Sequence, residues 1–275
     1  MSEFLFVGCQ AGVEKALKAD LAKHHPNLKF AFSRPGFVTF KCDAAWDDSQ
    51  PLKSVFVRTF GRSVGSLKTP SDDLDSFIEL FPVQEYRHLH VWTRDIRVPG
   101  DRRFEPIHTT ETLEIGQRLK AANEKFASVA VNRTAKQGDL VADLIVVDSD
   151  LWFAGWHQAS SIPSRWPGGV PPLRPREDMV SRAYLKMQEA LRWSRLPIAE
   201  GDVCVELGSS PGGSCQALLE RGLQVIGVDP AVMDERVLSH ENFTHVRARA
   251  ADLKRKEFAN VRWLCLLYTS DAADE

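Results

Sequence analysis

The stretch "GDVCVELGSSPGGSCQALLERGLQVIGVDP", residues 201–230, decides the fold of the C-terminal part of the chain. The apolar run Val203–Leu207 is typical of a buried strand, and the glycine-rich turn Gly208–Gly213 follows it directly. "SCQALLERG" then begins a helix, and "LQVIGVD" predicts a second strand. This order of elements predicts a Rossmann-like α/β sheet, in which the carboxyl ends of the strands hold a ligand.

The glycine turn limits the choice of ligand. Its glycines let a ligand approach the backbone closely, and the helix that follows presents free N–H groups. A dinucleotide fingerprint has the spacing G-x-G-x-x-G, whereas Gly208 is followed by three residues of the turn and then by "GG" at 212–213. This spacing disfavours NAD and a nicotinamide-dependent oxidoreductase. Glu206 and Asp229 suit a ligand with an ammonium group and a ribose diol, because carboxylates accept hydrogen bonds from both.

The composition is that of a soluble globular protein. The 275 residues include 43% hydrophobic and 26% charged residues, with a net charge of −2, and two or three domains are expected. No apolar run approaches the roughly 20 residues of a membrane span, and the first residues lack the basic start of a secretory signal. We therefore expect a cytoplasmic protein without a membrane partner. Because the cysteines are odd in number and widely scattered, we expect neither a metal site nor a disulfide; they are Cys9, Cys42, Cys204, Cys215 and Cys265.

Residues 1–67 have the pattern of a small ferredoxin-like α+β unit. Strand "FLFVG", helix "GVEKALKADLAKHH" and strands "LKFAFS" and "GFVTFK" are followed by one more strand within "SVFVRTFGRSVGSL". Nothing in this segment indicates catalysis.

Residues 68–158 predict a second α/β unit. Ser71 or Asp72 caps a short helix, strand "LHVWTRD" follows, residues 111–126 form an amphipathic helix, and two strands surround a turn at 148–150. Scattered surface charge is the favoured interpretation of its basic residues, because Asp and Glu are mixed among them, and a nucleic-acid face is the alternative. The residues of that face are Arg94, Arg97, Arg102, Arg103, Arg118, Lys120, Arg133 and Lys136, with Trp92 and His108 between them.

Residues 159–178, "ASSIPSRWPGGVPPLRPRED", contain five prolines and two glycines. Such a segment forms neither a long helix nor a central strand, so we expect a linker between domains. Arg165, Trp166, Arg174 and Arg176 are then plain linker residues. Beside an active site, they would instead suit a phosphate backbone and a stacked base.

The stretch "SRAYLKMQEALRW", residues 181–193, predicts an amphipathic helix. Its apolar stripe consists of Val180, Ala183, Tyr184, Met187, Ala190 and Leu191. Lys186 lies off this stripe. From the helix alone, a solvated surface lysine is the favoured interpretation.

The pattern E-L-G-x-x-P-G-G at 206–213, with "SRAYLK" at 181–186 upstream, resembles the FtsJ-like family of S-adenosylmethionine-dependent RNA ribose 2'-O-methyltransferases. The resemblance implies an incomplete methyltransferase domain at 179–265 with S-adenosyl-L-methionine as cofactor. The wider layout resembles bacterial enzymes that carry a THUMP-like RNA-binding domain, here at 68–158, and that methylate a cytidine ribose in large-subunit (23S) rRNA. The resemblance therefore implies 23S rRNA or its precursor as the partner.

The same resemblance assigns roles to individual residues. The residues implied to line the cofactor pocket are Ser181, Ser210, Pro211, Gly212, Gly213 and Asp229, with Asp252 against the adenine; Glu206 and Gly208 complete the expected cofactor-binding set. The family uses a Lys-Asp-Lys-Glu set, and Lys186 stands where the first lysine belongs. A ribose hydroxyl is a weak acid, so a cationic lysine would orient it and stabilise the developing charge, while a neighbouring lysine with a lowered pKa acts as base.

The sequence departs from the family after its fourth predicted strand, "VRWLC" at 261–265. Leu266 stands where the catalytic aspartate is expected, and the second lysine and the glutamate do not follow. The segment 266–275, "LLYTSDAADE", resembles a translated sequencing-adapter remnant. We therefore expect a non-native tail on a truncated, inactive methyltransferase. The alternative is a non-catalytic RNA-binding protein that keeps the cofactor fold, and the sequence leaves the oligomeric state open.

Overall fold

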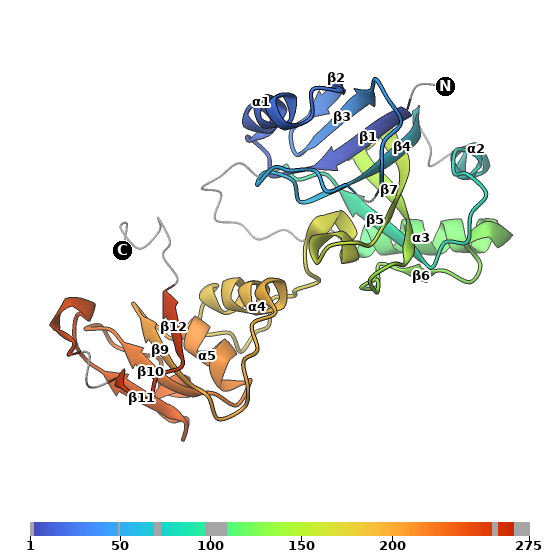
Figure 1. Cartoon of the computed structure of the whole chain (residues 1–275). Helices are drawn as coiled ribbons and strands as arrows, with labels where there is room; N and C mark the ends of the chain where they lie inside the picture. Colours follow the sequence, from blue (N-terminus) through green and yellow to red (C-terminus); the bar gives the residue numbers. More distant parts are fainter. Residues whose placement is uncertain (1–2, 49, 69–72, 97–108, 255–257, 267–275) are drawn as a thin grey trace. The chain divides into compact units, whose positions relative to one another are not determined.

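The chain folds into two compact units, Met1–Pro172 and Leu173–Glu275, each built around its own sheet (Figure 1). Both units contain helices and strands, so the predicted mixed α/β class is confirmed. The computed structural model describes residues 3–48, 50–68, 73–96, 109–254 and 258–266.

The first half of the N-terminal unit is the predicted ferredoxin-like run. Its elements are β1 (Glu3–Gly8), α1 (Glu14–His24), β2 (Leu28–Arg34), β3 (Phe37–Cys42) and β4 (Thr59–Lys68). Their order in the sheet is β2-β3-β1-β4, with antiparallel neighbours throughout. β3 therefore lies between β1 and β2, which is the split βαβ arrangement. Leu17 and Leu21 of α1 pack against Leu5 and Val7 of β1, so α1 covers one face of these strands.

The second half of this unit contains the predicted strand hairpin. Its elements are α2 (Leu74–Glu79), β5 (His88–Thr93), α3 (Thr110–Ala122), the 3-10 turn η1 (Glu124–Phe126), β6 (Ala130–Val131), β7 (Leu140–Asp148) and β8 (Leu151–Gln158). β7 and β8 are antiparallel, whereas β5 runs parallel to β6 and β7. α2 is capped by Asp73, whose carboxylate accepts a hydrogen bond from the Ser76 N–H at 3.0 Å. The predicted caps, Ser71 and Asp72, lie outside the described residues.

A pairing between β4 and β8 joins the two halves of the N-terminal unit. The antiparallel register runs from Arg62 opposite Trp156 to Lys68 opposite Leu151. One eight-stranded sheet, ordered β2-β3-β1-β4-β8-β7-β5-β6, therefore crosses the boundary expected between residues 67 and 68 without a break.

A buried polar network lies inside this sheet. Asp143 is 1% exposed and accepts hydrogen bonds from Trp92 Nε1 at 3.0 Å and His157 Nδ1 at 2.5 Å. The other ring nitrogen of His157, Nε2, lies 2.7 Å from the carbonyl oxygen of Ser164. Burial opposes the charged form of His157, but the Asp143 carboxylate and these hydrogen bonds raise its pKa. Because both ring nitrogens face acceptors, the ring donates from both and forms a buried ion pair with Asp143.

The predicted Pro-rich linker crosses between the units, but most of its length is packed. Its first part forms the 3-10 turns η2 (Pro163–Arg165) and η3 (Pro167–Gly169) on the N-terminal unit, where Trp166 is 6% exposed. Leu173 already belongs to the core of the C-terminal unit. The buried indole of Trp166 therefore does not support the alternative in which this residue stacks on a base.

The C-terminal unit contains the predicted parallel sheet. Its elements are α4 (Ala183–Ser194), β9 (Val203–Leu207), α5 (Gly213–Leu219), β10 (Gln224–Val228), α6 (Glu235–Leu238), β11 (Phe243–Val246), the 3-10 turn η4 (Ala250–Asp252) and β12 (Trp263–Leu266). The strand order is β11-β10-β9-β12, and all neighbours are parallel. The order reverses beside β9, and such a switch point is where open α/β sheets bind ligands.

One side of this parallel sheet is packed and the other is partly open. α4 and α5 pack against the sheet through a core that includes Leu185, Cys215 and Val225. On β12, by contrast, Leu264 is 69% and Leu266 is 62% exposed. Leu266 pairs with Leu207 of β9, so the last strand extends one residue beyond the boundary expected at Cys265.

Three further observations concern the parts of the chain that the structure describes. None of their helices is long and apolar enough to span a membrane. They contain no group of three or more His, Cys, Asp or Glu residues placed to hold a metal ion. All five cysteines are free thiols.

Candidate cofactor site

The glycine turn leaves the carboxyl end of β9 in a conformation that requires glycine. Gly208 has φ +72° and Gly212 has φ +117°, a backbone region that other L-residues rarely adopt. The N–H groups of Gly208 and Ser209 donate to the carbonyl oxygen of Val228 at 2.9 and 3.4 Å, so the turn is tied to β10. Among the residues that the structure describes, none except the chain neighbours of Gly208 lies within 4 Å of the position that a Cβ on Gly208 would occupy. The turn is therefore open to a ligand on this side.

Gly213 brings two distant predicted residues together. A Cβ on Gly213 would lie 2.2 Å from Ser181 Oγ and 3.0 Å from the backbone of Ser181 and Tyr184. Only glycine allows α5 to begin this close to the start of α4. The structure thus places Ser181 against the glycine turn, and its role in binding the cofactor stays a prediction from the resemblance.

Asp229, at the end of β10, fastens the turn from its other side. Its Oδ2 accepts a hydrogen bond from the Ser210 N–H at 3.0 Å, and its Oδ1 accepts one from the Ala231 N–H at 2.8 Å. Ser210 Oγ in turn donates to the carbonyl oxygen of Val232 at 2.8 Å. The half-buried Asp229 carboxylate retains acceptor capacity, because each of its oxygens has two lone pairs.

Glu206 lies beneath the turn and away from solvent. Its side chain is 1% exposed, and its two oxygens accept hydrogen bonds from the Ser214 hydroxyl and the Cys215 thiol, both in the first turn of α5. Burial raises the pKa of Glu206 to about 7, although the bond from Cys215 opposes this shift. The donors that the structure gives Glu206 therefore come from the protein itself.

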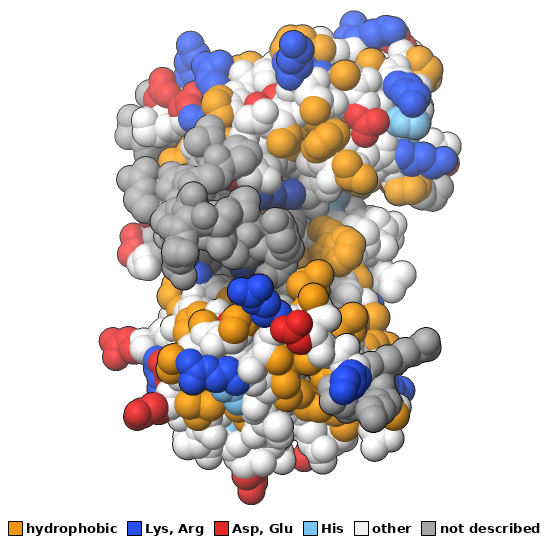
Figure 2. Space-filling model, turned by 90° about the vertical axis from the view of Figure 1, so that its left-hand side faces the viewer, with side chains coloured by type: hydrophobic (Ala, Val, Ile, Leu, Met, Phe, Trp, Pro, Cys, Tyr) orange, Lys and Arg blue, Asp and Glu red, His pale blue; other side chains and the backbone are white. Residues whose placement is uncertain are grey.

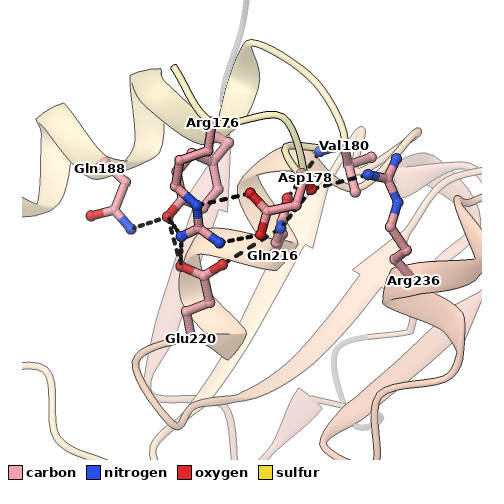
Figure 3. A network of polar contacts seen from close by, with 8 residues as sticks. Arg176, Asp178, Val180, Gln188, Gln216, Glu220 and Arg236 are labelled. Atoms are coloured by element: carbon pink, nitrogen blue, oxygen red, sulfur yellow. Dashed lines mark hydrogen bonds and ion pairs between the residues drawn. The ribbon is translucent and has the colours of Figure 1, made fainter. Parts of the chain in front are cut away.

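A polar network fixes α4 on α5 (Figure 3). Tyr184 Oη donates to Glu220 Oε2 at 2.6 Å, and Arg176 Nη1 donates to both groups, at 2.8 Å to Tyr184 and 3.2 Å to Glu220. Gln188, one turn further along α4, donates to Tyr184 Oη at 3.3 Å. These contacts hold the helix that carries Lys186 against the helix that follows the glycine turn.

The same network holds the segment that enters α4. Gln216 of α5 donates to the carbonyl oxygen of Asp178 at 3.1 Å and accepts from the Val180 N–H at 2.9 Å. Arg236 of α6 donates to the Asp178 carbonyl oxygen at 3.0 Å, as Figure 3 shows. Two helices therefore position the backbone directly before Ser181. The sequence analysis did not find these partners, because no local pattern links residues so far apart.

Lys186 and Asp252 lie on the surface of the C-terminal unit. In α4 the buried residues are Tyr184, Leu185, Met187 and Leu191, whereas Lys186 is exposed. Asp252 is exposed in η4. The structure thus brings Ser181, Asp229 and the glycine turn together, and the roles of Lys186 and Asp252 stay predictions from the resemblance.

Several described residues of the possible nucleic-acid face are buried or make contacts within the N-terminal unit. Trp92 is buried, Arg94 pairs with Asp148, and Lys120 Nζ donates to the carbonyl oxygen of Val129 at 3.0 Å. Figure 2 shows Lys and Arg spread over one face of the molecule, with Asp, Glu and apolar side chains among them. Arg97, Arg102, Arg103 and His108 lie outside the described residues. These contacts favour scattered structural charge, which was the preferred interpretation.

Comparison with known proteins agrees with this geometry. Residues 179–274 match the model of the FtsJ-like methyltransferase family. The C-terminal unit therefore matches the FtsJ-like methyltransferase family over nearly its whole length. The match continues through most of the segment 266–275 that we expected to be non-native.

Curated relatives match both units of this chain. A protein named ribosomal RNA large subunit methyltransferase M from Shewanella woodyi is 25% identical over 94% of this chain and 75% of its own length. A protein of the same name from Ectopseudomonas mendocina is 26% identical over 89% of this chain and 72% of its own length. The solved structure of TrmN from Thermus thermophilus aligns with a TM-score of 0.40 at 16% identity, covering 99% of this chain and 80% of that one.

Proposed function

We propose that this protein is an S-adenosylmethionine-dependent rRNA 2'-O-ribose methyltransferase that acts on a cytidine of 23S rRNA. The observation that carries the proposal is the E-L-G-x-x-P-G-G turn, which lies at the switch point of an FtsJ-like sheet. The rRNA substrate is taken from the names of the relatives that match both units. Cytidine and the ribose 2'-oxygen are the finer part of the proposal and rest on the family resemblance.

The residues at the turn fit S-adenosylmethionine. The open side of Gly208 lets a ligand approach the backbone closely. The half-buried Asp229 carboxylate provides hydrogen-bond acceptors for a ribose diol. The residues proposed to hold the cofactor are Ser181, Gly208, Ser210, Pro211, Gly212, Gly213, Asp229 and Asp252. When bound, this cofactor supplies an electrophilic methyl group on a sulfonium centre.

Lys186 is proposed to act on the ribose hydroxyl. Its ammonium group donates a hydrogen bond to the 2'-oxygen, orients it toward the methyl group and stabilises the partial negative charge on that oxygen. Groups that orient or move such a proton contribute about 10²- to 10⁴-fold to a rate. The hydrogen bond between Tyr184 and Glu220 fixes α4, the helix that carries this lysine, on α5.

One observation favours a second candidate function. Leu266 ends β12, where the family resemblance implies a catalytic aspartate, and an alkyl side chain neither accepts nor donates a proton. A protein with leucine at position 266 would bind the cofactor and RNA but would transfer the methyl group slowly. The second candidate is therefore an RNA-binding protein that retains a cofactor site.

A transfer assay separates the two functions. The 275-residue chain is incubated with tritium-labelled S-adenosylmethionine and unmodified 23S rRNA, beside Lys186→Ala and the matched control Arg192→Ala on the same helix. Label that resists alkaline cleavage of the RNA and falls about 100-fold in Lys186→Ala alone supports the methyltransferase. Cofactor binding without transfer supports the second candidate, and absence of cofactor binding contradicts both.

A further inference from the structure

A buried carboxyl group beneath the glycine turn has no part in the proposed chemistry. Glu206 Oε2 accepts from Cys215 Sγ at 2.8 Å, and Oε1 accepts from the Ser214 hydroxyl. Glu206 is 1%, Ser214 3% and Cys215 0% exposed. Both oxygens of this buried group are therefore tied to one structural element, the first turn of α5.

α5 has no side-chain cap at its N-terminus. The N-cap residue of α5 is Gly212, which has no side chain with which to accept a hydrogen bond from the helix. Most helices are capped by a polar side chain at that position. The side chain of Glu206 reaches across from β9 and links the strand that precedes the turn to the helix that follows it. The end of β9 and the start of α5, which flank the glycine turn, are thereby held at a fixed distance and orientation.

The surroundings of Glu206 make the hydrogen bonds from α5 important. The titratable groups that interact with it are Cys204 on β9, Cys265 on β12, Cys215 on α5 and Asp229 after β10. None of these described neighbours is a cation. Burying an ionised carboxyl group is costly unless hydrogen bonds compensate, so Ser214 and Cys215 stabilise its charged form.

We propose that Glu206 is a positioning residue, which fixes the glycine turn for the cofactor without touching the cofactor. The role rests on the proposed function, since it concerns the same S-adenosylmethionine site. It differs from the role expected from the sequence, in which Glu206 itself accepts a hydrogen bond from the ammonium group. A direct contact and a positioning role make different predictions for a ligand that lacks the ammonium group.

The test compares two ligands by isothermal titration calorimetry. S-adenosylmethionine carries the amino-acid group, and 5'-methylthioadenosine does not. Dissociation constants are measured for the wild type, Glu206→Gln, Ser214→Ala and the double variant, with Glu241→Gln, an exposed glutamate of the same unit, as the matched control. Circular dichroism melts confirm that each variant is folded at the titration temperature.

A positioning role affects both ligands equally. Glu206→Gln and Ser214→Ala each raise both dissociation constants about tenfold, the size expected when a buried hydrogen bond is broken. The double variant is no weaker than either single one, because the two groups act as one unit. For 5'-methylthioadenosine, wild-type affinity falls between pH 8 and pH 6 as Glu206 gains a proton, and this dependence is absent in Glu206→Gln.

Three results would overturn the inference. A loss confined to S-adenosylmethionine in Glu206→Gln shows a direct contact with the ammonium group. Ser214→Ala without effect, or additive losses in the double variant, shows that Glu206 does not act through α5. If the wild type binds neither ligand, the proposed function fails first and this role with it. Should Glu206→Gln not fold, Ser214→Ala decides by the same comparison of ligands.

Discussion

The two sheets of this protein place their polar groups in opposite ways. In the parallel sheet of the C-terminal unit, Asp229 and the glycine turn lie where strands end, so neighbouring loops meet at one edge. In the mixed sheet of the N-terminal unit, Asp143 and His157 lie within strands and are buried. The first arrangement can bind a ligand, whereas the second stabilises the unit from within. Each prediction below tests this difference.

The largest expected effect is in the N-terminal unit. Asp143→Ala leaves the charged ring of His157 buried without its partner, and breaking a buried ion pair in this way costs about 3–5 kcal/mol of unfolding free energy. Denaturant unfolding measures this cost, with Asp150→Ala in the exposed β7–β8 turn as control. A loss equal to that of the control would show that the network does not stabilise the sheet.

The second effect is a pH dependence that belongs to the C-terminal unit. Burial raises the pKa of Glu206 from its ordinary value of 4.5 to about 7, so folding favours its protonated form. The contribution of Glu206 to the unfolding free energy is therefore fully present below pH 4.5 and is lost as the pH rises through 7. The loss amounts to about 3 kcal/mol. The difference in unfolding free energy between the wild type and Glu206→Gln, measured from pH 4.5 to pH 8, isolates this contribution. A difference that does not change over this range would contradict it.

A third test concerns the close approach of α4 and α5. Gly213→Ala places a Cβ on the backbone of Ser181 and Tyr184, and overpacking of this kind costs about 1–3 kcal/mol. The affinity for S-adenosylmethionine should fall as well, because the glycine turn must shift to accommodate the Cβ. Gly201→Ala is the control, since its Cβ meets nothing within 4 Å, although its φ of +81° still strains the backbone. Equal affinities for the two variants would mean that the contact with Ser181 does not shape the site.

The smallest effect is expected on the open side of the parallel sheet. Leu264 is 69% exposed, so Leu264→Ala should change the unfolding free energy by less than about 0.5 kcal/mol. The same truncation at the fully buried Leu144 of the mixed sheet should cost about 2–5 kcal/mol. Thermal unfolding of both variants measures the contrast, and a large loss at Leu264 would show that this side is covered in solution.

Elements with short-range signals were predicted closely from the sequence. The apolar run at 203–207 is a strand with those bounds, and the helices and strands around it follow in the expected order. The glycine turn was recognisable because its backbone needs glycine at Gly208 and Gly212. Structure that depends on residues close together in the sequence can therefore be predicted from the sequence.

Features that depend on long-range pairing were not predicted. The β4–β8 pairing, which makes one sheet of two expected units, joins strands that α2, β5, α3, β6 and β7 separate along the chain. Arg176 and Glu220 are 44 residues apart, and no periodic pattern connects them. The contacts of Glu206 with Ser214 and Cys215 link β9 to α5, and no local pattern predicts them.

Hydrogen–deuterium exchange of the 275-residue chain with and without S-adenosylmethionine tests the central claim most directly. If the switch point of the parallel sheet is the cofactor site, the added protection falls on Gly208–Gly213 and on the segment after Asp229, and NAD at the same concentration produces none. Protection confined to the N-terminal unit, or equal protection by NAD, would contradict the account.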